Sequence, residues 1–376
     1  MNDFKIPPIS TLVGSTLNNF FRVLKDGTVS PRYYYKIFLT CLIIFVITPL
    51  HWWEKIVFRR KLKQFRFEKA PLFIIGHWRS GTTLMHNVLC KDPSSGFMTT
   101  YYSLFPNNLA SKWFFRMFIK LNIPGKRPSD NMELNINFPQ EDEFAFSNCQ
   151  PNAYYNFFYF PQQYKEIYEK AIRHKYLNES EIRNWYRSYD ILLKKALIDS
   201  GGGRLIMKNP VNTARIDKIL KLYPDAKFLY IYRNPVTVFY STRNFYQKLF
   251  PKVWLKEVDY EFIDNLIIEV YQRLLTDYQA QKALIPTGNL MELKFEEFEL
   301  NPVDEVKKIY SDLLKEDFNL AEPYLVKYLN SLTGYNKNKY SVPRDSLNKI
   351  VSEWDHYMKL YDYDIPDDIV VNGSSS

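Results

Sequence analysis

Residues 71–89 read PLFIIGHWRSGTTLMHNVL, and this stretch decides the fold. Its first part, LFII, is a short apolar run of β-branched and aromatic residues that stops at Gly76. A polar loop with a second glycine, Gly81, follows, and TLMHNVL then has the apolar spacing of a helix. A strand, a glycine-containing loop and a helix in this order predict a turn whose backbone N–H groups and helix N-terminus face an anion.

The same alternation continues along the chain. Apolar runs at 205–210 (LIMKNP), 227–235 (KFLYIYRNP) and 290–295 (LMELKF) predict further strands, and helical patterns at 213–223, 236–249 and 261–284 separate them. Strands that alternate with helices indicate an α/β fold with a P-loop-like central parallel sheet flanked by helices, here preceded by an N-terminal hydrophobic helical segment. Ligands of such sheets bind at the carboxyl ends of the strands.

The composition narrows the class of protein. The 376 residues are 46% hydrophobic and 24% charged, which excludes a disordered or collagen-like chain. Fifty Lys and Arg against 41 Asp and Glu give a net charge of +9, which suits a phosphate-bearing ligand, an anionic membrane surface or nucleic acid. Three widely spaced cysteines favour a reducing cytoplasm over a disulfide framework. Since no paired metal-ligand motif is present, we expect no metal.

The loop at 76–83 differs at one position from a loop that binds a nucleoside triphosphate. Its spacing matches G-x-x-x-x-G-K-S/T, but Thr82 stands where that pattern has the lysine that reaches the β- and γ-phosphates. The cation of this loop, Arg79, comes earlier. The loop therefore suits a nucleotide whose reactive group is attached directly to its α-phosphate, and it disfavours the alternative of a magnesium-dependent phosphotransferase.

Two motifs stand directly after predicted strands: RSGTT at 79–83, and Arg233-Asn234-Pro235 with Ser241 eight residues after the arginine. Together with MELKFEEFELNP at 291–302, they resemble sulfotransferases that use 3′-phosphoadenosine 5′-phosphosulfate (PAPS), above all the bacterial and tyrosylprotein branch. The resemblance runs from about residue 71 to the carboxyl end. It implies that the 5′-phosphosulfate is held by Arg79, Ser80, Gly81, Thr82 and Thr83, and the 3′-phosphate by Arg233 and Ser241.

The resemblance also indicates the catalytic groups. Lys208, in Lys208-Asn209-Pro210, is similar to the family's lysine that neutralises the leaving phosphate, and with Arg79 it would stabilise the developing charge without a metal. A hydroxyl acceptor also needs a base to take its proton. We predict Glu141 as this base, from the adjacent carboxylates of 141–143, with Glu143 as its substitute and His77 as its rival. A charge cluster at a helix N-terminus is the structural alternative for these carboxylates.

The apolar segments point to the acceptor. Residues 151–160, PNAYYNFFYF, are dense in aromatic side chains that either line an apolar pocket or fill the core. With the N-terminal segment they favour a small hydrophobic alcohol, such as a sterol-like molecule or a lipid, over a soluble sugar or a glycan. No nucleic acid is expected as a partner, because the cations stand at predicted strand ends rather than on one surface.

Residues 37–50, IFLTCLIIFVITPL, form the one long apolar run. The run is short for a membrane span, and we expect Pro49 to shorten it further. Trp52, Trp53 and a basic cluster follow it. We favour a membrane-surface anchor, while a helix packed on the catalytic domain and a true span stay open. The predicted organisation is an N-terminal segment at 1–66, a catalytic domain at 67–370 and a flexible tail at 371–376, in a cytoplasmic protein at the inner face of the membrane.

Two further stretches extend these predictions. Residues 111–120, SKWFFRMFIK, place Lys112, Arg116 and Lys120 beside an aromatic face, which indicates an amphipathic helix that covers the core or contacts a membrane. Residues 336–347 are basic and occupy the place where related enzymes close a loop over the 3′-phosphate. Candidates for that role are Lys337, Lys339 and Arg344.

Overall fold

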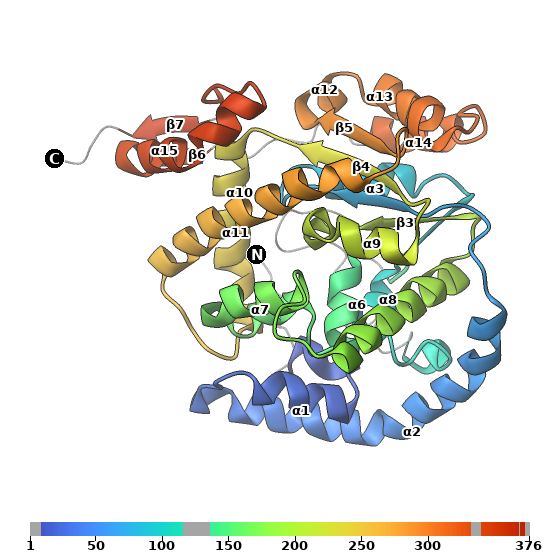
Figure 1. Ribbon diagram of the computed structural model, residues 1–376. Helices are drawn as coiled ribbons and strands as arrows, with labels where there is room; N and C mark the ends of the chain where they lie inside the picture. Colours follow the sequence, from blue (N-terminus) through green and yellow to red (C-terminus); the bar gives the residue numbers. More distant parts are fainter. Residues whose placement is uncertain (1–8, 116–135, 332–339, 368, 373–376) are drawn as a thin grey trace. The chain divides into compact units, whose positions relative to one another are not determined.

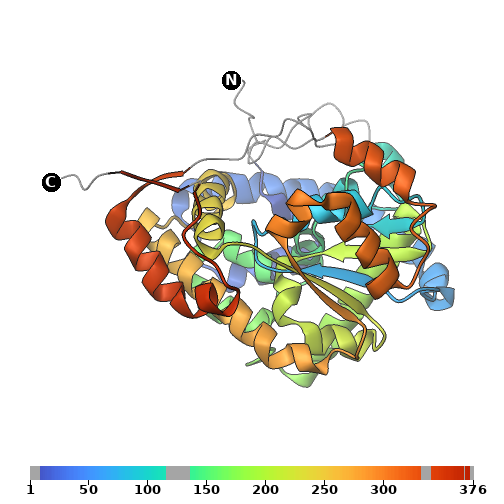
Figure 2. The same cartoon turned by 90° about the horizontal axis from the view of Figure 1, so that it is seen from above.

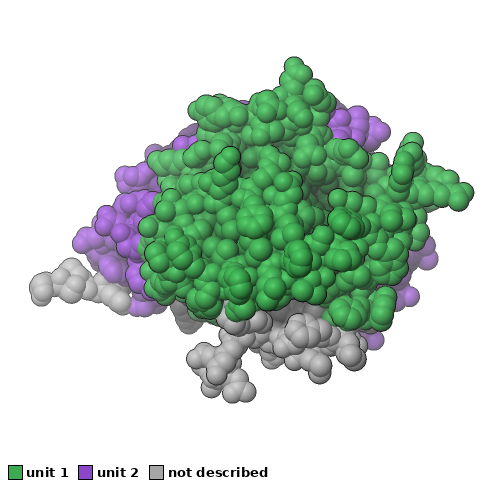
Figure 3. Space-filling model, turned by 90° about the horizontal axis from the view of Figure 1, so that it is seen from below, with its two compact units in different colours: residues 1–71, 94–207, 248–258 green, residues 72–93, 208–247, 259–376 purple. Residues whose placement is uncertain are grey.

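The computed structural model describes residues 9–115, 136–331, 340–367 and 369–372, which Figure 1 draws as a coloured ribbon. The chain forms two compact units, which Figure 3 colours separately. Unit 1 comprises Met1–Pro71, Ser94–Met207 and Lys248–Val258, and unit 2 comprises Leu72–Pro93, Lys208–Gln247 and Asp259–Ser376.

Unit 1 is mainly helical. Its α-helices are α1 (Leu17–Lys25), α2 (Tyr34–Gln64), α4 (Thr100–Leu104), α6 (Asp142–Cys149), α7 (Tyr164–Ala171) and α8 (Glu179–Ser200). Short 3₁₀ turns are η1 (Thr11–Gly14), η2 (Pro31–Tyr33), η3 (Tyr154–Phe158) and η4 (Pro161–Gln163), and the strands are β2 (Ser95–Phe97) and β3 (Arg204–Lys208), the latter ending at the first residue of unit 2. A hydrophobic core cluster joins α1 and α2 to Tyr159 and Phe160 after η3.

Unit 2 alternates strands and helices. Its strands are β1 (Leu72–Ile75), β4 (Lys227–Tyr232), β5 (Leu290–Lys294), β6 (Tyr340–Pro343) and β7 (Ile369–Asn372). Its helices are α3 (Thr82–Leu89), α9 (Ile216–Leu222), α10 (Pro235–Val253, which ends in unit 1), α11 (Tyr260–Gln281), α12 (Phe295–Leu300), α13 (Pro302–Lys308), α14 (Glu322–Ser331) and α15 (Arg344–Leu360). Two 3₁₀ turns, η5 (Pro210–Ala214) and η6 (Lys282–Leu284), and a π-helical segment, η7 (Ile309–Leu314), complete it.

The strands pair in parallel, as the alternation of strands and helices predicts. Leu72 to Ile75 of β1 align with Lys227 to Tyr230 of β4, and β4 pairs in turn with β5. In unit 1, β2 pairs in parallel with β3. The N–H of Asn209, directly after β3, donates a hydrogen bond to the carbonyl oxygen of Ile74 at 3.3 Å. The residues that follow β1 and β3 therefore emerge at the same edge of the sheet.

Helices cover the sheet of unit 2. Tyr278 of α11 stacks on Tyr230 of β4 with ring centroids 4.0 Å apart, and Phe73 of β1 stacks on Phe228 at 5.8 Å. Helix α15 lies beside α11 (Figure 2). Trp354 of α15 stacks on Tyr271 of α11, with ring centroids 4.0 Å apart. These contacts confirm the predicted α/β fold with a parallel sheet flanked by helices, together with its N-terminal apolar helix.

Helix α2 is longer than the apolar run that predicted it. It continues through Pro49 to Gln64, so the prediction that this proline shortens the segment is wrong. A proline inside a helix removes one backbone hydrogen bond and can bend the helix, but it does not have to end it. The hydroxyl of Thr48 donates to the carbonyl oxygen of Ile44 at 2.8 Å on the turn before it. The basic residues after Trp53 therefore belong to the same helix.

A two-stranded sheet near the carboxyl end was not predicted. β6 and β7 pair in parallel from Tyr340 with Ile369 to Pro343 with Asn372. Val371 and Asn372, the first residues of the predicted tail, thus belong to a strand. Both strands have only four residues each, which gives apolar alternation too little length to show.

Candidate functional site

The loop between β1 and α3 depends on two glycines. Gly76 (φ +137°) and Gly81 (φ +95°) both have positive φ, a conformation that side chains rarely adopt. A Cβ atom would overlap the carbonyl oxygen of Ile231 at Gly76 and the ring of Phe295 at Gly81. Gly81 is the N-cap residue of α3, so its backbone turn presents the N-terminus of that helix at the end of the loop.

Side chains inside unit 2 hold the loop in shape. The hydroxyl of Ser80 is buried and donates to the carbonyl oxygen of His77 at 2.7 Å. The N–H of Gly76 donates to the hydroxyl of Thr213 at 2.7 Å, and that hydroxyl also lies 3.1 Å from the carbonyl oxygen of Gly76. Thr213 belongs to η5, so the turn after β3 supports the loop after β1. Ser80 therefore serves the backbone of the loop, while Thr82 is buried at the start of α3.

Arg79 joins the two predicted nucleotide-binding motifs. Its Nε donates a hydrogen bond to Oγ of Ser241 at 2.9 Å, although the two residues are 162 positions apart. Ser241 is buried on α10, two turns after Pro235. The backbone of Arg79 has φ +68°, in the left-handed region that non-glycine residues seldom occupy. The loop thus holds this side chain in an unusual position, pointed at the second motif.

Arg233 lies in the same group. Its NH1 is 3.5 Å from the carbonyl oxygen of Arg79, and its guanidinium carbon lies 4.7 Å from the ring centroid of Phe295. The same ring contacts the position of Gly81, so Phe295 packs against both the loop and this cation. The sequence singled out the stretch 291–302, but it gave no sign that Phe295 joins the two motifs. A ring next to a glycine and an arginine becomes visible only in three dimensions.

Lys208 lies at the third predicted strand end. Its side chain is buried, and Nζ donates to Oγ1 of Thr83 in the first turn of α3 at 3.2 Å. The structure therefore brings Lys208, Arg79, Arg233 and Ser241 to the loop within unit 2, as predicted from the carboxyl ends of parallel strands. Which ligand groups these side chains hold stays a prediction.

Lys208 and Arg233 are positioned by the same local device, which sequence reasoning missed. Each is followed by Asn-Pro. The side chain of Asn209 accepts a hydrogen bond from the N–H of Val211, and that of Asn234 accepts one from the N–H of Val236, each at 3.0 Å. An asparagine that caps the next turn, followed by a proline in the first helical position, ends the strand at a fixed place. The repeated Asn-Pro after a cation was the available signal.

His77, the rival candidate for the base, is buried at 4% exposure. Its Nδ1 lies 2.8 Å from the carbonyl oxygen of Trp78, and its ring packs on the ring of Tyr271 at 5.0 Å. Burial lowers the pKa of His77 to about 4, and the hydrogen bond to Trp78 opposes that shift. An imidazole with so low a pKa is neutral at pH 7 but is a weak base.

The three candidate carboxylates differ in their surroundings within unit 1. Glu141 is the N-cap residue of α6, and its Oε2 accepts a short hydrogen bond from the hydroxyl of Tyr155. Asp142 and Glu143 are fully buried and accept hydrogen bonds from the hydroxyl of Tyr189 at 2.5 Å and from the N–H of Tyr154 at 2.6 Å. All three carboxylates therefore lie at the N-terminus of α6, as the structural alternative expected. Among the three, Glu141 is the one whose side chain is partly exposed.

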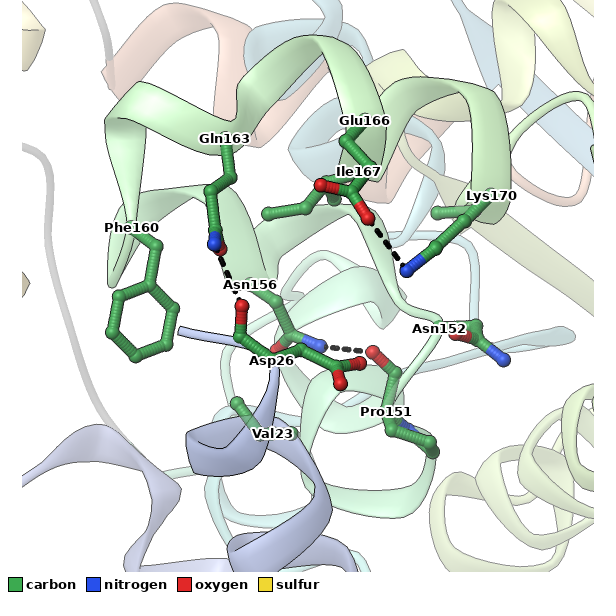
Figure 4. Close-up of a pocket in the computed structure, with 11 residues that line it drawn as sticks. Val23, Asp26, Pro151, Asn152, Asn156, Phe160, Gln163, Glu166, Ile167 and Lys170 are labelled. Carbon is green, nitrogen blue, oxygen red and sulfur yellow. Dashed lines mark hydrogen bonds and ion pairs between the residues drawn. The ribbon is translucent and has the colours of Figure 1, made fainter. Parts of the chain in front are cut away.

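The aromatic stretch 151–160 forms core in unit 1. Phe157 and Phe158 are buried, and their ring centroids lie 4.2 Å apart. Both rings also pack on Phe250, with centroid distances of 6.1 Å and 5.8 Å. A neighbouring pocket, drawn in Figure 4, has a cavity volume of about 30 Å³, the space of about one water molecule. Its polar groups pair with one another, as Lys170 with Glu166 at 2.7 Å and Asn156 with the carbonyl oxygen of Pro151 at 2.7 Å. This pocket is therefore too small for a substrate.

Two predicted stretches are only partly described. Lys112 pairs with Asp199 at 2.6 Å, whereas Trp113 and Phe114 are 72% and 58% exposed. Arg344 is exposed at the first position of α15. The remaining residues of these predictions lie outside the described residues: Arg116, Phe118, Ile119, Lys120, Lys337 and Lys339.

Across the described ranges of the chain, no group of three or more His, Cys, Asp or Glu side chains is placed to hold a metal ion. Arg79 and Lys208 instead contact the hydroxyls of Ser241 and Thr83 beside the N-terminus of α3, and cations at a helix N-terminus are the chemistry that binds oxyanions.

Curated relatives exist over nearly the whole chain. The omega-hydroxy-beta-dihydromenaquinone-9 sulfotransferases Stf3 of Mycobacterium bovis and Mycobacterium tuberculosis are each 27% identical over 355 residues, covering 94% of this chain and 91% of the relative.

Solved structures show the same fold. Sulfotransferase STF9 from Mycobacterium avium matches with a TM-score of 0.67 at 15% identity, over 92% of this chain and 89% of that one. Sulfotransferase STF1 from Mycobacterium tuberculosis H37Rv matches with a TM-score of 0.64 at 14% identity, over 94% of each chain.

The family itself is identified by a sequence model. The model described as the sulfotransferase family matches residues 71–316, which begin just before β1 and include the loop, both Asn-Pro turns and Phe295. Most of the chain therefore carries the family pattern, and the residues that the structure gathers in unit 2 lie inside it. The chain belongs to the sulfotransferase family.

Proposed function

We propose that this enzyme transfers the sulfuryl group of PAPS to the hydroxyl of a small hydrophobic alcohol. The proposal that PAPS is the sulfuryl donor rests on the hydrogen bond from Arg79 to Ser241. This bond joins RSGTT to the motif that begins at Arg233. Two anion-binding elements at one place suit a nucleotide with phosphates at both its 3′ and 5′ positions. Thr82, in the position of a P-loop lysine, disfavours the alternative of a phosphotransferase.

The residues of unit 2 fit such a donor. The backbone from Ser80 to Thr83 and the N-terminus of α3 form the cradle, which the two left-handed glycines keep open. PAPS supplies a sulfuryl group on a phosphosulfate linkage whose cleavage leaves negative charge on the 5′-phosphate. Lys208 and Arg79 would neutralise that charge from fixed positions, and Arg233 and Ser241 would hold the 3′-phosphate.

Glu141 is the proposed base. Its carboxylate would take the proton of the acceptor hydroxyl, and the hydroxyl of Tyr155 orients it by donating to Oε2. Glu143 is less suited to this role, because its carboxylate is fully buried and already accepts a hydrogen bond from the backbone. His77 is less suited as well, because burial leaves it weakly basic.

The proposed acceptor is a lipid alcohol. The name of the relative Stf3 gives an omega-hydroxylated dihydromenaquinone as the acceptor of that protein. We extend the class, a hydroxyl on a long apolar molecule, to this chain, and the large exposed apolar surface of α2 agrees with a lipid substrate.

The three cysteines are free, which supports the proposed cytoplasmic location.

Thermal unfolding of the purified chain tests the donor. PAP (3′-phosphoadenosine 5′-phosphate) or PAPS without metal should raise the midpoint, since a ligand at 100 times its Kd adds about 2.7 kcal/mol to the free energy of unfolding. ATP with magnesium should leave it unchanged. A shift with ATP and magnesium alone would contradict the proposal.

Transfer of labelled sulfate from PAPS tests the acceptor. Omega-hydroxylated quinones, other lipid alcohols, sterols and oligosaccharides should be compared at equal concentration. The proposal expects turnover with the lipid alcohols. Turnover restricted to oligosaccharides would replace the lipid acceptor by a glycan and leave the donor assignment intact.

A further inference from the structure

Helix α2 presents an unusual surface for a helix of a folded unit. Within the described part of the chain, one helical stretch, Pro31–Gln64, is long and apolar enough to cross a membrane by length and composition. Yet α2 also packs against α1, η1, η2 and α8 of unit 1. Figure 3 views unit 1 from the side that carries α1 and α2.

One side of α2 is apolar and faces solvent. We call this the apolar face, and its members range in exposure from 50% to 73%: Phe38, Leu42, Phe45, Val46, Trp52 and Ile56. At about 100° per residue these side chains fall within a sector of about 120° around the helix axis. Such a stripe is wide enough to enter an apolar phase along its whole length. Single exposed apolar residues are common on protein surfaces, whereas a continuous stripe of them marks an interaction surface.

The opposite side of α2 is fixed to unit 1 by buried polar contacts. Nζ of Lys36 donates to the carbonyl oxygen of Lys252 at 2.9 Å, and Nε2 of His51 lies 3.0 Å from Oδ1 of Asn108. The carboxylate of Glu54 pairs with Lys195 and accepts a hydrogen bond from the N–H of Ala110 at 2.5 Å. Surrounding α2 with lipid would leave these groups without partners, at a cost of several kcal/mol each.

The charges on α2 complement an anionic surface. Glu54 is its one acidic residue and is buried toward unit 1, so it does not offset the exposed cations. The exposed cations follow the aromatic pair Trp52 and Trp53 and are Lys55, Arg59, Arg60, Lys61 and Lys63. Tryptophan and basic residues at the edge of an apolar stripe are the pattern of helices that lie in the headgroup region of a bilayer.

We propose that α2 lies in the plane of an anionic phospholipid bilayer, with the apolar face in the lipid and the opposite face held on unit 1. This selects the surface anchor among the three possibilities that the sequence left open. The inference concerns unit 1 and stands independently of the donor and the acceptor proposed above.

Vesicle flotation of the full chain tests the apolar face. The protein should float with vesicles of phosphatidylcholine and phosphatidylglycerol, and the triple variant Phe38→Ser, Phe45→Ser, Ile56→Ser should lose at least about tenfold in partitioning. The matched control is Leu300→Ser, Leu320→Ser, Tyr324→Ser, which removes three exposed apolar residues of unit 2. Equal partitioning of the two variants would overturn the proposal. Both variants should keep the circular dichroism spectrum and the unfolding midpoint of the wild type, which separates lost binding from misfolding.

Two further measurements test the orientation and the charge. Alkaline carbonate should release the chain from vesicles if α2 lies in the plane, and retention would show a span instead. Arg59→Gln, Arg60→Gln, Lys63→Gln should weaken binding to phosphatidylglycerol vesicles and should reduce its dependence on salt.

A second copy of the chain is the competing occupant of the apolar face. Sedimentation velocity without lipid should give the same mass for the wild type and the Phe38→Ser, Phe45→Ser, Ile56→Ser variant. A wild-type dimer that this variant converts to a monomer, with no flotation of either, would replace the bilayer by a protein interface.

Discussion

Arg79 and Ser241 form a hydrogen bond of 2.9 Å between Nε and Oγ, which connects the loop after β1 to the second turn of α10. Ser241 is thus a partner of the loop cation as well as a candidate ligand of the 3′-phosphate. A group that holds a charged side chain and an anion together contributes through both contacts.

Ser241→Ala should weaken PAP binding by about tenfold or more, because a hydrogen bond to a charged group contributes about 1.5–3 kcal/mol. Titration calorimetry measures the affinity. Ser331→Ala, at an exposed position of α14, is the matched control and should bind PAP as the wild type does. Unchanged affinity in Ser241→Ala would remove this residue from the proposed donor site.

Lys208→Ala should lower kcat by about 10² to 10³, the usual loss for one group that stabilises charge in the transition state. Because Lys208 is buried, the substitution also removes packing, and kcat should be compared per folded enzyme, well below the unfolding midpoint of the variant. The control is Lys327→Ala on the exposed side of α14. If kcat stayed at the wild-type value, the charge on the leaving group would have to be neutralised elsewhere.

Gly81→Ala should abolish donor binding, whereas Gly288→Ala should only destabilise the chain. Both glycines have positive φ, +95° and +81°, so each substitution strains the backbone by about 1–2 kcal/mol. A Cβ at Gly288 meets nothing within 4 Å, while one at Gly81 overlaps Phe295 and would displace the N-terminus of α3. Urea unfolding and PAP titration of both variants separate the two effects. Equal PAP affinities would argue against a cradle at this helix end.

Glu141→Gln should lower kcat by about 10² to 10⁴ with PAP affinity unchanged, as expected for loss of a general base. Glu143→Ala should instead lower the unfolding midpoint, because it leaves the buried N–H of Tyr154 without its acceptor. Steady-state kinetics with saturating acceptor and thermal unfolding distinguish these outcomes. If folded Glu143→Ala enzyme, saturated with both substrates, lost more of its kcat than Glu141→Gln, Glu143 would be the base and Glu141 would have the structural role.

The sequence predicted the parts of unit 2 whose signal is local. The strand before Gly76 and the cations at strand ends are patterns within ten residues, and the structure places them as expected. The tertiary contacts of these residues could not be predicted in the same way. The contact of Phe295 with Gly81 and the hydrogen bond between Thr213 and Gly76 join segments that are far apart in the sequence. Neither segment has a local pattern that predicts its partner.

The apolar segments show the same limit. The run 37–50 predicted a helix, but its opposite faces could not be told apart, because apolar residues occur on both. Buried polar side chains such as His51 and Glu54 lie beyond the run, and they are what fix the buried face of α2. In 151–160, aromatic density alone left core and pocket open, and only packing against Phe250 assigned Phe157 and Phe158 to the core.

His77 should make the stability of the chain depend on pH. Burial lowers its pKa in the folded state from 6.5 to about 4, so the unfolded chain takes up a proton first as the pH falls. The contribution of the neutral imidazole is therefore complete above pH 6.5 and is lost progressively between pH 6.5 and 4, to a limit of about 3 kcal/mol. His77→Asn should flatten the decline of the unfolding free energy in this window.

The pKa of His51 is also lowered by burial, and because this residue is present in both the wild type and His77→Asn, its titration cancels from the comparison. Urea unfolding at several pH values from 4 to 7 measures the slopes. Parallel slopes for the wild type and His77→Asn would show that the imidazole has the same pKa in the folded and the unfolded chain, and His77 would then return as a candidate to exchange a proton with the acceptor.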